Sequence, residues 1–364
     1  TIYCAFIIIV GEYFVNLTIV AFPRFLGERF GLFRSVEIIN SKLIGTGACI
    51  PDFVLTNAML EKMVDTNDEW IVQRTGVRER RIAKNTHTWE LALGAAQDAL
   101  ADAGITAEKL DLILVSTCSP DTNTPNTASI LQDKLGARQV GAFDINNACT
   151  GFVSATDIAD SYIKSGKAKT VLVVSAETLS RIVDYTDRST CILFGDGAAA
   201  AVYQATEDET VGILSTFTAA DGSGAEYLHM EALPVEDPLS GDRTVDPKAR
   251  FLKMQGAPVV RFTARAVPLA IDTALKRAGV TAEEIDWVVP HQANLRILDV
   301  IARRYHLPKE KIYVNMDRFG NTSSASVPIC LNEMRKNGLL HEGQTIVCTG
   351  FGGGLTYGAF VLKL

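Results

Sequence analysis

One cysteine lies where a short apolar strand passes into an amphipathic helix. In DINNACTGF, residues 144–152, Cys149 follows the strand-like QVGAFDIN, and apolar residues then recur three and four positions apart up to Ile163. A cysteine at a helix N-terminus meets unpaired N–H groups and the positive end of the helix dipole, which favour the reactive thiolate. Taken alone, Cys149 is either such a nucleophile or a buried thiol without chemistry, because free cysteines are among the most buried residues.

A histidine and an asparagine occupy comparable positions later in the chain. His291 directly follows the apolar WVVP, and Asn321 lies in a glycine-containing turn, RFGNTSSASVP, before another helix. Each is weak evidence alone, but with Cys149 they form a Cys-His-Asn set. Such a set can hydrolyse an acyl substrate, with histidine as the base and asparagine orienting its ring. It can also carry an acyl group on cysteine and stabilise an enolate with two N–H donors, which allows carbon–carbon bond formation.

The local sequence favours the second chemistry. The Cys-Gly-Ser-Cys-Trp type of signature found around papain-like nucleophiles is absent. GFGGG, residues 350–354, is a poor dinucleotide-binding loop, because the strand-like LTYGAFVLKL follows it instead of a helix.

An internal duplication indicates how these residues are brought together. ALADAGITAEKLDLILVST (99–117) and ALKRAGVTAEEIDWVVPHQ (274–292) are identical at eight of nineteen positions, 175 residues apart. The same offset pairs TVLVVS (170–175) with TIVCTG (345–350) and brings DINNACTGF next to DRFGNTSSAS (317–326). Alternating strands and helices predict two parallel-rich sheets covered by helices, whose sites gather at the carboxyl ends of strands. Cys149 in one half should therefore meet His291 and Asn321 in the other.

Composition and charge exclude several classes of function. A net charge of −7 gives no general electrostatic case for binding nucleic acid. The 7 cysteines are odd in number and widely spaced, unlike a disulfide framework or a zinc site, which predicts a reducing cytoplasm.

The first residues differ from the rest of the chain. Residues 1–22 are strongly apolar and are followed by three arginines, but Glu12 and Asn16 interrupt them. We expect residues 1–35 to be an extension outside the core; a membrane or interfacial anchor and an ordinary packed segment are the alternatives. The two halves are then expected at 36–211, with the cysteine, and at 212–364, with the histidine and asparagine.

From about Ile39 to the C-terminus the chain resembles a known family. TNDEWIVQRTGVRERRIA, NNACTGF, TDRSTCILFGDGAAAAV, PHQANLRI, GNTSSASVP and GFGGG occur in the order found in β-ketoacyl-[acyl-carrier-protein] synthases III, of the thiolase-like superfamily. The resemblance implies an α/β fold of duplicated βαβαβ halves in α-β-α-β-α layers. It also implies decarboxylative condensation of an acyl-CoA primer with malonyl-[acyl-carrier protein], giving 3-oxoacyl-[acyl-carrier protein], CoA and carbon dioxide, the first step of fatty acid biosynthesis.

The resemblance assigns roles to the residues of the set. Cys149 would become the acyl thioester, while His291 and Asn321 would bind the malonyl thioester carbonyl and promote loss of carbon dioxide. The N–H groups of Cys149 and Gly353 would form the oxyanion hole for acyl transfer, and Phe351 would shield the site.

Binding residues follow from the same comparison. Trp70 and Arg188 would sandwich the adenine of coenzyme A, and Thr66 and Arg74 would contact its nucleotide end. Without the resemblance, a core residue of an amphipathic helix would be the preferred interpretation of Trp70.

The family's docking positions for the acidic carrier protein correspond here to Arg261 and Arg296, which could also be ordinary solvated arginines. The resemblance implies a cytoplasmic homodimer that needs no metal, no other cofactor and, for its core, no membrane.

Two regions depart from the family pattern. Where short-chain members of the family have a phenylalanine that reaches across the dimer into the acyl pocket, this sequence has Thr124. The smaller side chain leaves room for a longer or branched primer, so the sequence does not specify acetyl-CoA. The polar, proline-containing segment 231–250 is predicted to be a surface loop. Related Cys-His-Asn enzymes make quinolone, olefin or polyketide precursors, so a different condensation is the alternative function, followed by a non-catalytic acyl-binding scaffold.

Overall fold

The computed structural model describes residues 39–232, 239 and 248–364. Ile38–Leu364 form one compact unit. The extension predicted for residues 1–35 lies outside the described residues, and so does most of the segment 231–250. Among the helices of the described residues, none combines the length and the apolar character needed to cross a membrane.

The first half contains a five-stranded sheet with helices on both faces. Its main elements are β1 (Asn40–Cys49), α4 (Thr88–Ala103), β4 (Leu112–Ser116), α5 (Thr127–Lys134), β5 (Gly141–Ile145), α6 (Gly151–Lys164), β6 (Thr170–Glu177) and β7 (Gly197–Thr206). The strand order is β1-β7-β6-β4-β5, with β6, β4 and β5 parallel and β7 antiparallel to both its neighbours. The central strands β4 and β6 are buried along their whole length, as their unbroken apolar sequences predict.

The second half repeats this arrangement with four strands. Its main elements are β8 (Gly212–Ala220), α8 (Gly256–Ala278), β11 (Trp287–Pro290), α9 (Leu295–Arg304), α11 (Ser326–Lys336), β12 (Thr345–Gly352) and β13 (Thr356–Lys363). The strand order β11-β12-β13-β8 matches β4-β6-β7-β1 of the first half. In place of the fifth strand, Ile312 makes an isolated parallel bridge to Val288 of β11. The proposed boundary at 211/212 falls between β7 and β8.

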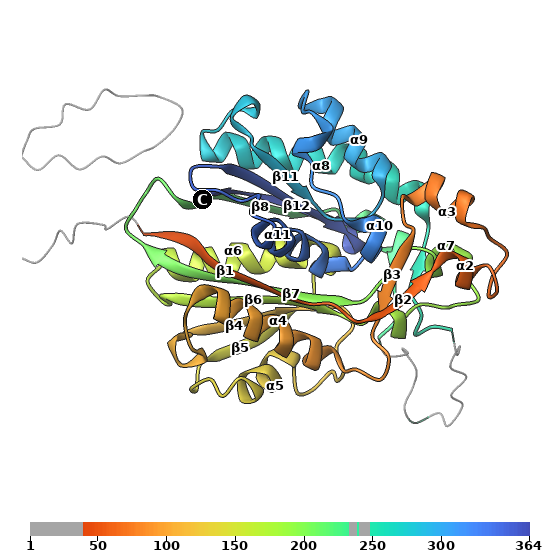
Figure 1. Ribbon diagram of the computed structural model, residues 1–364, viewed down its shortest axis with the longest axis horizontal. Coiled ribbons are helices and arrows are strands. Elements are labelled where there is room, and N and C mark those ends of the chain that lie inside the picture. Colours follow the sequence, from red (N-terminus) through yellow and green to blue (C-terminus); the bar gives the residue numbers. More distant parts are fainter. Residues whose placement is uncertain (1–38, 233–238, 240–247) are drawn as a thin grey trace, which may run out of the picture. The chain divides into compact units, whose positions relative to one another are not determined.

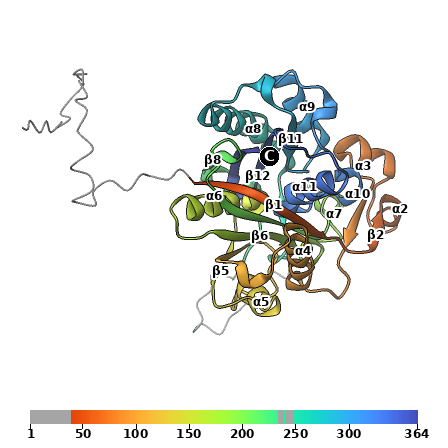
Figure 2. The same cartoon turned by 60° about the vertical axis from the view of Figure 1, so that its left-hand side comes forward.

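The two sheets enclose a central helix layer (Figures 1 and 2). Buried residues of α6 and α11 form one core with residues of both sheets, including Leu114 and Phe360. The outer face of the first sheet is covered by α4 and α5, and that of the second sheet by α8 and α9. These layers and the solved structures compared below confirm the predicted α-β-α-β-α thiolase-like fold.

The offset of 175 residues extends to the boundaries of the elements. It separates Gly151 from Ser326 at the starts of α6 and α11, and Thr170 from Thr345 at the starts of β6 and β12. It also separates Ala148 from Ser323, two non-glycine residues with φ of 44° and 49°. A left-handed residue therefore precedes the central helix in each half, a conformation that costs about 1–2 kcal/mol for a residue with a side chain.

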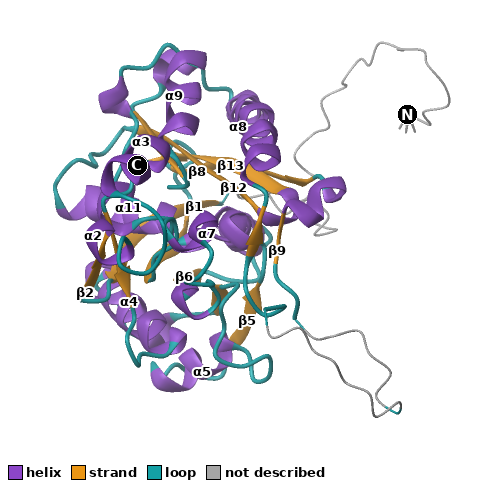
Figure 3. Cartoon of the chain, turned by 90° about the vertical axis from the view of Figure 1, so that its right-hand side faces the viewer, coloured by secondary structure: helices purple, strands orange, loops and turns teal. Residues whose placement is uncertain are grey.

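Smaller elements complete the fold. They are β2 (Phe53–Thr56), α2 (Asn57–Leu60), α3 (Asp68–Thr75), β3 (Glu79–Ile82), α7 (Arg188–Cys191), β9 (Leu228–His229), β10 (Lys253–Met254) and α10 (Met316–Phe319). Five of them (α2, β2, α3, α7 and β9) are labelled in Figure 3. A hydrogen bond from Asn294 Nδ2 to the Arg74 carbonyl, 2.8 Å, joins α3 of the first half to the start of α9 in the second.

Candidate active site

Cys149, His291 and Asn321 line one cavity of about 140 Å³, together with Phe351 and Gly352. Cys149 precedes α6, His291 follows β11, and Asn321 precedes α11. All three are nearly inaccessible to solvent, with exposed fractions of 6%, 1% and 7%. The convergence predicted from the duplication is therefore present, because equivalent strand ends of the two halves meet at this point.

Cys149 lies in the 3₁₀ turn Ala148–Thr150, which leads directly into α6. The left-handed Ala148 reverses the chain after β5, and the Thr150 N–H donates to the Asn147 carbonyl at 3.1 Å. The predicted placement of Cys149 at a helix N-terminus thus agrees with the structure.

The predicted lowering of the Cys149 pKa is wrong for the resting protein. Burial raises the pKa of the thiol to about 12, although a hydrogen bond from Ser323 lowers it in part. Removing the thiolate from water outweighs the helix N-terminus, since desolvation disfavours any charged form. Cys149 is therefore a neutral thiol at neutral pH, and its negative charge must develop during reaction with the substrate.

His291 is held from its backbone and from one ring nitrogen. Its N–H donates to the Thr349 carbonyl at 2.8 Å, and Nδ1 lies 2.7 Å from Ser326 Oγ. The Phe351 ring contacts the imidazole edge to face, with ring centroids 5.1 Å apart, which fits its predicted shielding position. Burial lowers the pKa of His291 to about 3, and a backbone hydrogen bond with Ser323 raises it in part. The imidazole is therefore neutral and carries one N–H.

The orientation of the Asn321 amide is fixed by its own turn. The Ser323 N–H donates to Asn321 Oδ1 at 2.8 Å, so Nδ2 is the end of the amide that remains available as a donor. The backbone is anchored to the first half, because the Asn321 N–H donates to the Leu193 carbonyl at 2.8 Å. Asn321 is thus held as a rigid N–H donor at the cavity.

The glycine that packs directly against the cysteine is Gly352. A Cβ on Gly352 would lie 2.8 Å from the Cys149 Cβ and 3.1 Å from its Sγ, closer than packed atoms allow. Gly353, the residue predicted for the oxyanion hole, lines a second cavity next to Cys149. The sequence gives no reason to choose among the glycines of GFGGG. The sequence analysis therefore did not predict that Gly352 packs against Cys149.

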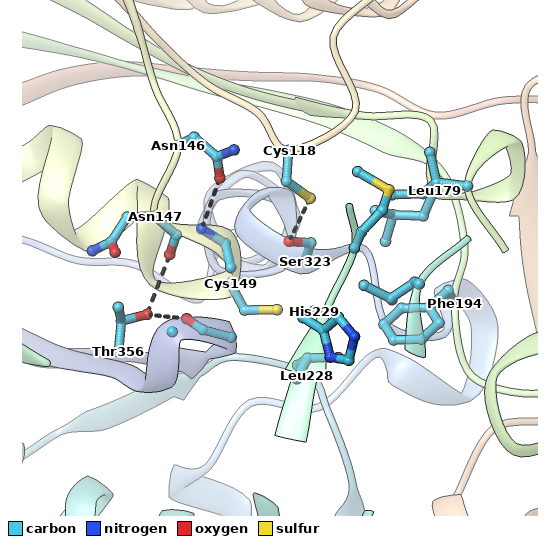
Figure 4. A pocket seen from close by; sticks show the side chains of 16 residues that line it. Cys118, Asn146, Asn147, Cys149, Leu179, Phe194, Leu228, His229, Ser323 and Thr356 are labelled. Carbon is cyan, nitrogen blue, oxygen red and sulfur yellow. Dashed lines mark hydrogen bonds between the residues drawn. The ribbon is translucent and has the colours of Figure 1, made fainter. Parts of the chain in front are cut away.

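That second cavity, of about 340 Å³, also borders Cys149 and is mostly apolar (Figure 4). Cys118, Leu179, Phe194, Leu228 and His229 are among its lining residues. Cys149 lines both cavities, and so do Phe194 and Leu228. Cys118 and His229 were missed by the sequence analysis, which carries no signal for residues that only the fold brings to the cysteine.

A buried carboxylate supports the segment that carries Asn321. Glu177, at the end of β6, accepts hydrogen bonds from Ser119 Oγ at 2.6 Å and from Ser324 Oγ at 2.8 Å. The Cys118 N–H also donates to it, at 3.1 Å. Burial raises the pKa of Glu177, while these donors lower it in part. The bond to Ser324 ties the second half to the end of a strand of the first.

The residues expected to bind coenzyme A lie together near α3. The guanidinium of Arg188 lies 5.1 Å from the centre of the Trp70 ring, and that of Arg74 lies 4.6 Å from it. Arg74 therefore stacks on the tryptophan as well. Thr66 Oγ1 is buried and has no hydrogen-bond partner among the described residues. Trp70 is half-buried and packs against an apolar cluster that includes Leu60 and Ile71.

Of the two arginines expected to meet a carrier protein, Arg296 lines a groove between α8 and α9. The groove also contains Val260, Val300 and Arg303, and Arg261 is exposed on α8 next to Val260. Neither Arg261 nor Arg296 forms an ion pair with a described residue. Thr124 is exposed and lines neither cavity of its own chain.

Comparison with known proteins identifies the family. Family models described as 3-oxoacyl-[acyl-carrier-protein (ACP)] synthase III and as the C-terminal part of that enzyme match residues 143–222 and 275–364. The β-ketoacyl-[acyl-carrier-protein] synthase III of Clostridium novyi (strain NT) is 45% identical over 324 residues, covering 89% of this chain and 99% of the relative.

Comparison with solved structures points to the same family. The 3-oxoacyl-[acyl-carrier-protein] synthase III of Aquifex aeolicus VF5 is 46% identical, with a TM-score of 0.83 over 89% of this chain and 100% of its own. The priming β-ketosynthase from the R1128 polyketide biosynthetic pathway is 37% identical, with a TM-score of 0.82 over 92% of this chain and 98% of its own. The chain therefore belongs to the β-ketoacyl-[acyl-carrier-protein] synthase III family.

Proposed function

We propose that the protein condenses an acyl-CoA primer with malonyl-[acyl-carrier protein] to give 3-oxoacyl-[acyl-carrier protein], CoA and carbon dioxide. The observation that carries the proposal is one buried cavity containing a thiol, an imidazole and an amide whose donor end is fixed. Family membership supports the same reaction. It makes the protein an acyltransferase that initiates fatty acid synthesis.

In the first half-reaction Cys149 sulfur attacks the carbonyl carbon of the acyl-CoA. The carbon–sulfur bond to coenzyme A breaks, and the thiol proton ends on the departing coenzyme A sulfur, so no net proton is consumed. The N-terminus of α6 faces the sulfur and stabilises the charge that develops on it. The N–H groups of Cys149 and Gly353 are proposed to bind the carbonyl oxygen during this step.

The second half-reaction uses the cavity that contains His291 and Asn321. The malonyl thioester carbonyl accepts hydrogen bonds from the imidazole N–H and from Asn321 Nδ2. Loss of carbon dioxide leaves the electron pair as an enolate on that oxygen, where the two donors stabilise it. The enolate carbon attacks the acyl group on Cys149, the thioester bond breaks, and the Cys149 sulfur regains a proton from solvent.

The two cavities suggest separate places for the substrates. The 140 Å³ cavity is also lined by Asn294 at the start of α9 and by the exposed Val260, so we assign it to the phosphopantetheine arm of either substrate. The 340 Å³ apolar cavity, which also borders Cys149, is then the place for the primer's acyl chain. Trp70, Arg74, Arg188 and Thr66 are proposed to hold the nucleotide of coenzyme A, by stacking and cation–π contact.

The proposal is tested by mass spectrometry and product analysis. The protein is incubated with acyl-CoAs of increasing chain length, and then with malonyl-[acyl-carrier protein]. We expect a covalent mass increase on Cys149 that disappears when malonyl-[acyl-carrier protein] is added, together with release of one carbon dioxide per product. Absence of any covalent adduct would indicate a scaffold, and release of free fatty acid without condensation would indicate a hydrolase.

We predict that charge reversal at Arg296 weakens use of the carrier protein selectively. Arg296→Glu should raise KM for malonyl-[acyl-carrier protein] by about tenfold, about 1.4 kcal/mol, because an attractive contact with an acidic partner becomes repulsive. Steady-state kinetics at several salt concentrations measure this. Arg261→Glu should act in the same direction.

Trp70→Ala is the matched control, since it should raise KM for acyl-CoA more than KM for malonyl-[acyl-carrier protein]. Equal losses toward both substrates in Arg296→Glu, or no loss toward either, would remove Arg296 from the docking site.

We also propose a homodimer. β5 is the edge strand of the first sheet, with one side unpaired by any described strand, and Thr124 is exposed where a second copy could receive it. Sedimentation at micromolar concentration should give a mass near twice 39.4 kDa. A fully active monomer would contradict this prediction.

The alternative is a related condensation that supplies another acyl product, as in the R1128 priming β-ketosynthase. The chain-length series above distinguishes the two by the primer that is accepted. We propose that the reaction needs no metal and no cofactor besides the coenzyme A thioester itself, and that it takes place in the cytoplasm. The free cysteines at positions 49, 118, 149, 191, 330 and 348 are consistent with a reducing compartment.

A further inference from the structure

The hydroxyl of Ser326 contacts the side of His291 that faces away from the substrate cavity. Ser326 is the first residue of α11, and its exposed fraction is 1%. Its Oγ lies 2.7 Å from His291 Nδ1, 2.9 Å from the Ser323 carbonyl oxygen and 3.4 Å from the Gln292 N–H. No described residue makes a hydrogen bond to His291 Nε2, which is left for the cavity.

These three neighbours limit what the single hydroxyl hydrogen can do. The Gln292 N–H can only donate, so it occupies a lone pair of Ser326 Oγ. The Ser323 carbonyl can only accept, but it already receives the backbone N–H of Ser326. If the hydroxyl hydrogen points toward His291, the Ser323 carbonyl therefore still has the Ser326 N–H as its hydrogen-bond donor. Two acceptors compete for this hydrogen. His291 Nδ1 is the closer, at 2.7 Å, and the Ser323 carbonyl oxygen lies at 2.9 Å.

The direction of the Ser326 hydroxyl hydrogen matters because it bears on which ring nitrogen of the neutral His291 imidazole carries the hydrogen. A neutral imidazole carries one N–H, and the proposed enolate-stabilising role requires that hydrogen on Nε2. Nδ1 must then accept a hydrogen bond, and Ser326 is the side-chain donor beside it. The backbone hydrogen bond with Ser323 raises the pKa of His291 in part, against the larger lowering by burial.

We propose that Ser326 is a positioning residue that donates its hydroxyl hydrogen to His291 Nδ1 and thereby holds the ring in the Nε2–H tautomer that condensation requires. This inference rests on the proposed function. Ser326 takes no part in acylation of Cys149, for which the Nε2 hydrogen is not needed.

The test separates the two half-reactions in the full-length protein. Ser326→Ala removes the side-chain hydroxyl that contacts Nδ1, so nothing on that side chain then favours the Nε2–H form and the hydrogen should move to Nδ1. We expect carbon dioxide release from malonyl-[acyl-carrier protein] to fall about 10- to 100-fold, since a buried hydrogen-bonding group loses its partner. Acyl-enzyme formation with acyl-CoA should change less than threefold. Ser326→Cys, which keeps a weak donor, should lie between wild type and Ser326→Ala.

A spectroscopic measurement reports the tautomer without turnover. Nitrogen-15 NMR of histidine-labelled protein at neutral pH should show His291 as the Nε2–H form in the wild type and as the Nδ1–H form in Ser326→Ala. The matched control is Ser324→Ala, which removes the neighbouring buried hydroxyl that binds Glu177 and not His291. It should leave the Nε2–H form in place.

The outcomes are distinguishable. If the wild type itself releases no carbon dioxide, the proposed function fails. If the wild type is active, the inference is overturned by an unchanged tautomer in Ser326→Ala, by equal loss of both half-reactions, or by normal carbon dioxide release.

Discussion

Replacing Cys149 by serine is expected to abolish formation of the acyl-enzyme. A hydroxyl is a much weaker nucleophile than a thiol that can become a thiolate at a helix N-terminus. The buried site adds to this, because the same desolvation that raises the pKa of Cys149 to about 12 would oppose an alkoxide more strongly. We expect overall condensation to fall by at least about 10³-fold, roughly 4 kcal/mol in the barrier.

The measurement is the covalent mass increase after incubation with acyl-CoA, followed by the rate of 3-oxoacyl product formation. Cys49→Ser is the matched control, because Cys49 lines neither of the two cavities and is half-buried at the end of β1. It should be acylated at the wild-type rate. Condensation by Cys149→Ser at a near-normal rate would refute the assignment of the nucleophile.

Replacing His291 or Asn321 by alanine is expected to separate the two half-reactions. Each variant removes one of two N–H donors to the enolate oxygen, so decarboxylation should fall about 10²- to 10³-fold, or 2.7–4 kcal/mol per donor. Acylation of Cys149 should remain measurable in both variants, since its oxyanion is proposed to bind backbone N–H groups instead. Carbon dioxide release and the covalent mass increase are measured on the same samples.

The two variants differ in one respect that serves as a check. Asn321 also accepts the Ser323 N–H, and loss of that bond in Asn321→Ala could loosen the turn before α11. Asn321→Asp keeps an acceptor for this N–H but removes the donor, so it should lose decarboxylation without loss of thermal stability. A variant that decarboxylates normally but cannot be acylated would reverse the proposed roles.

The sequence determined the architecture because its signals are periodic and local. Short unbroken apolar runs rich in branched residues, such as LILVS and TVLVVS, predict central strands covered on both faces, and both are such strands. The offset of 175 residues can be read from the sequence alone. It separates the first residue of α6 from that of α11, and the first residue of β6 from that of β12. From strand ends alone, Cys149, His291 and Asn321 could be expected to meet.

The chemical state of the site was decided by the tertiary structure. The helix N-terminus before α6 predicted a lowered pKa for Cys149, but a pKa depends on everything that surrounds the group. Residues of both halves bury the thiol and the imidazole. Burial raises the pKa of the Cys149 thiol and lowers the pKa of the His291 imidazole. No local pattern contains that burial.

The supporting residues were likewise fixed only by folding. Gly352 meets Cys149 across 203 positions of sequence, and Ser326 meets His291 across 35. Neither one of the four glycines in GFGGG nor one of the three serines in NTSSAS reveals from the sequence which residue it will contact. The sequence thus determined which elements form and in which order, through periodicities that each segment carries by itself. Which side chains share a cavity, and which of them are desolvated there, depended on contacts between segments distant in the chain.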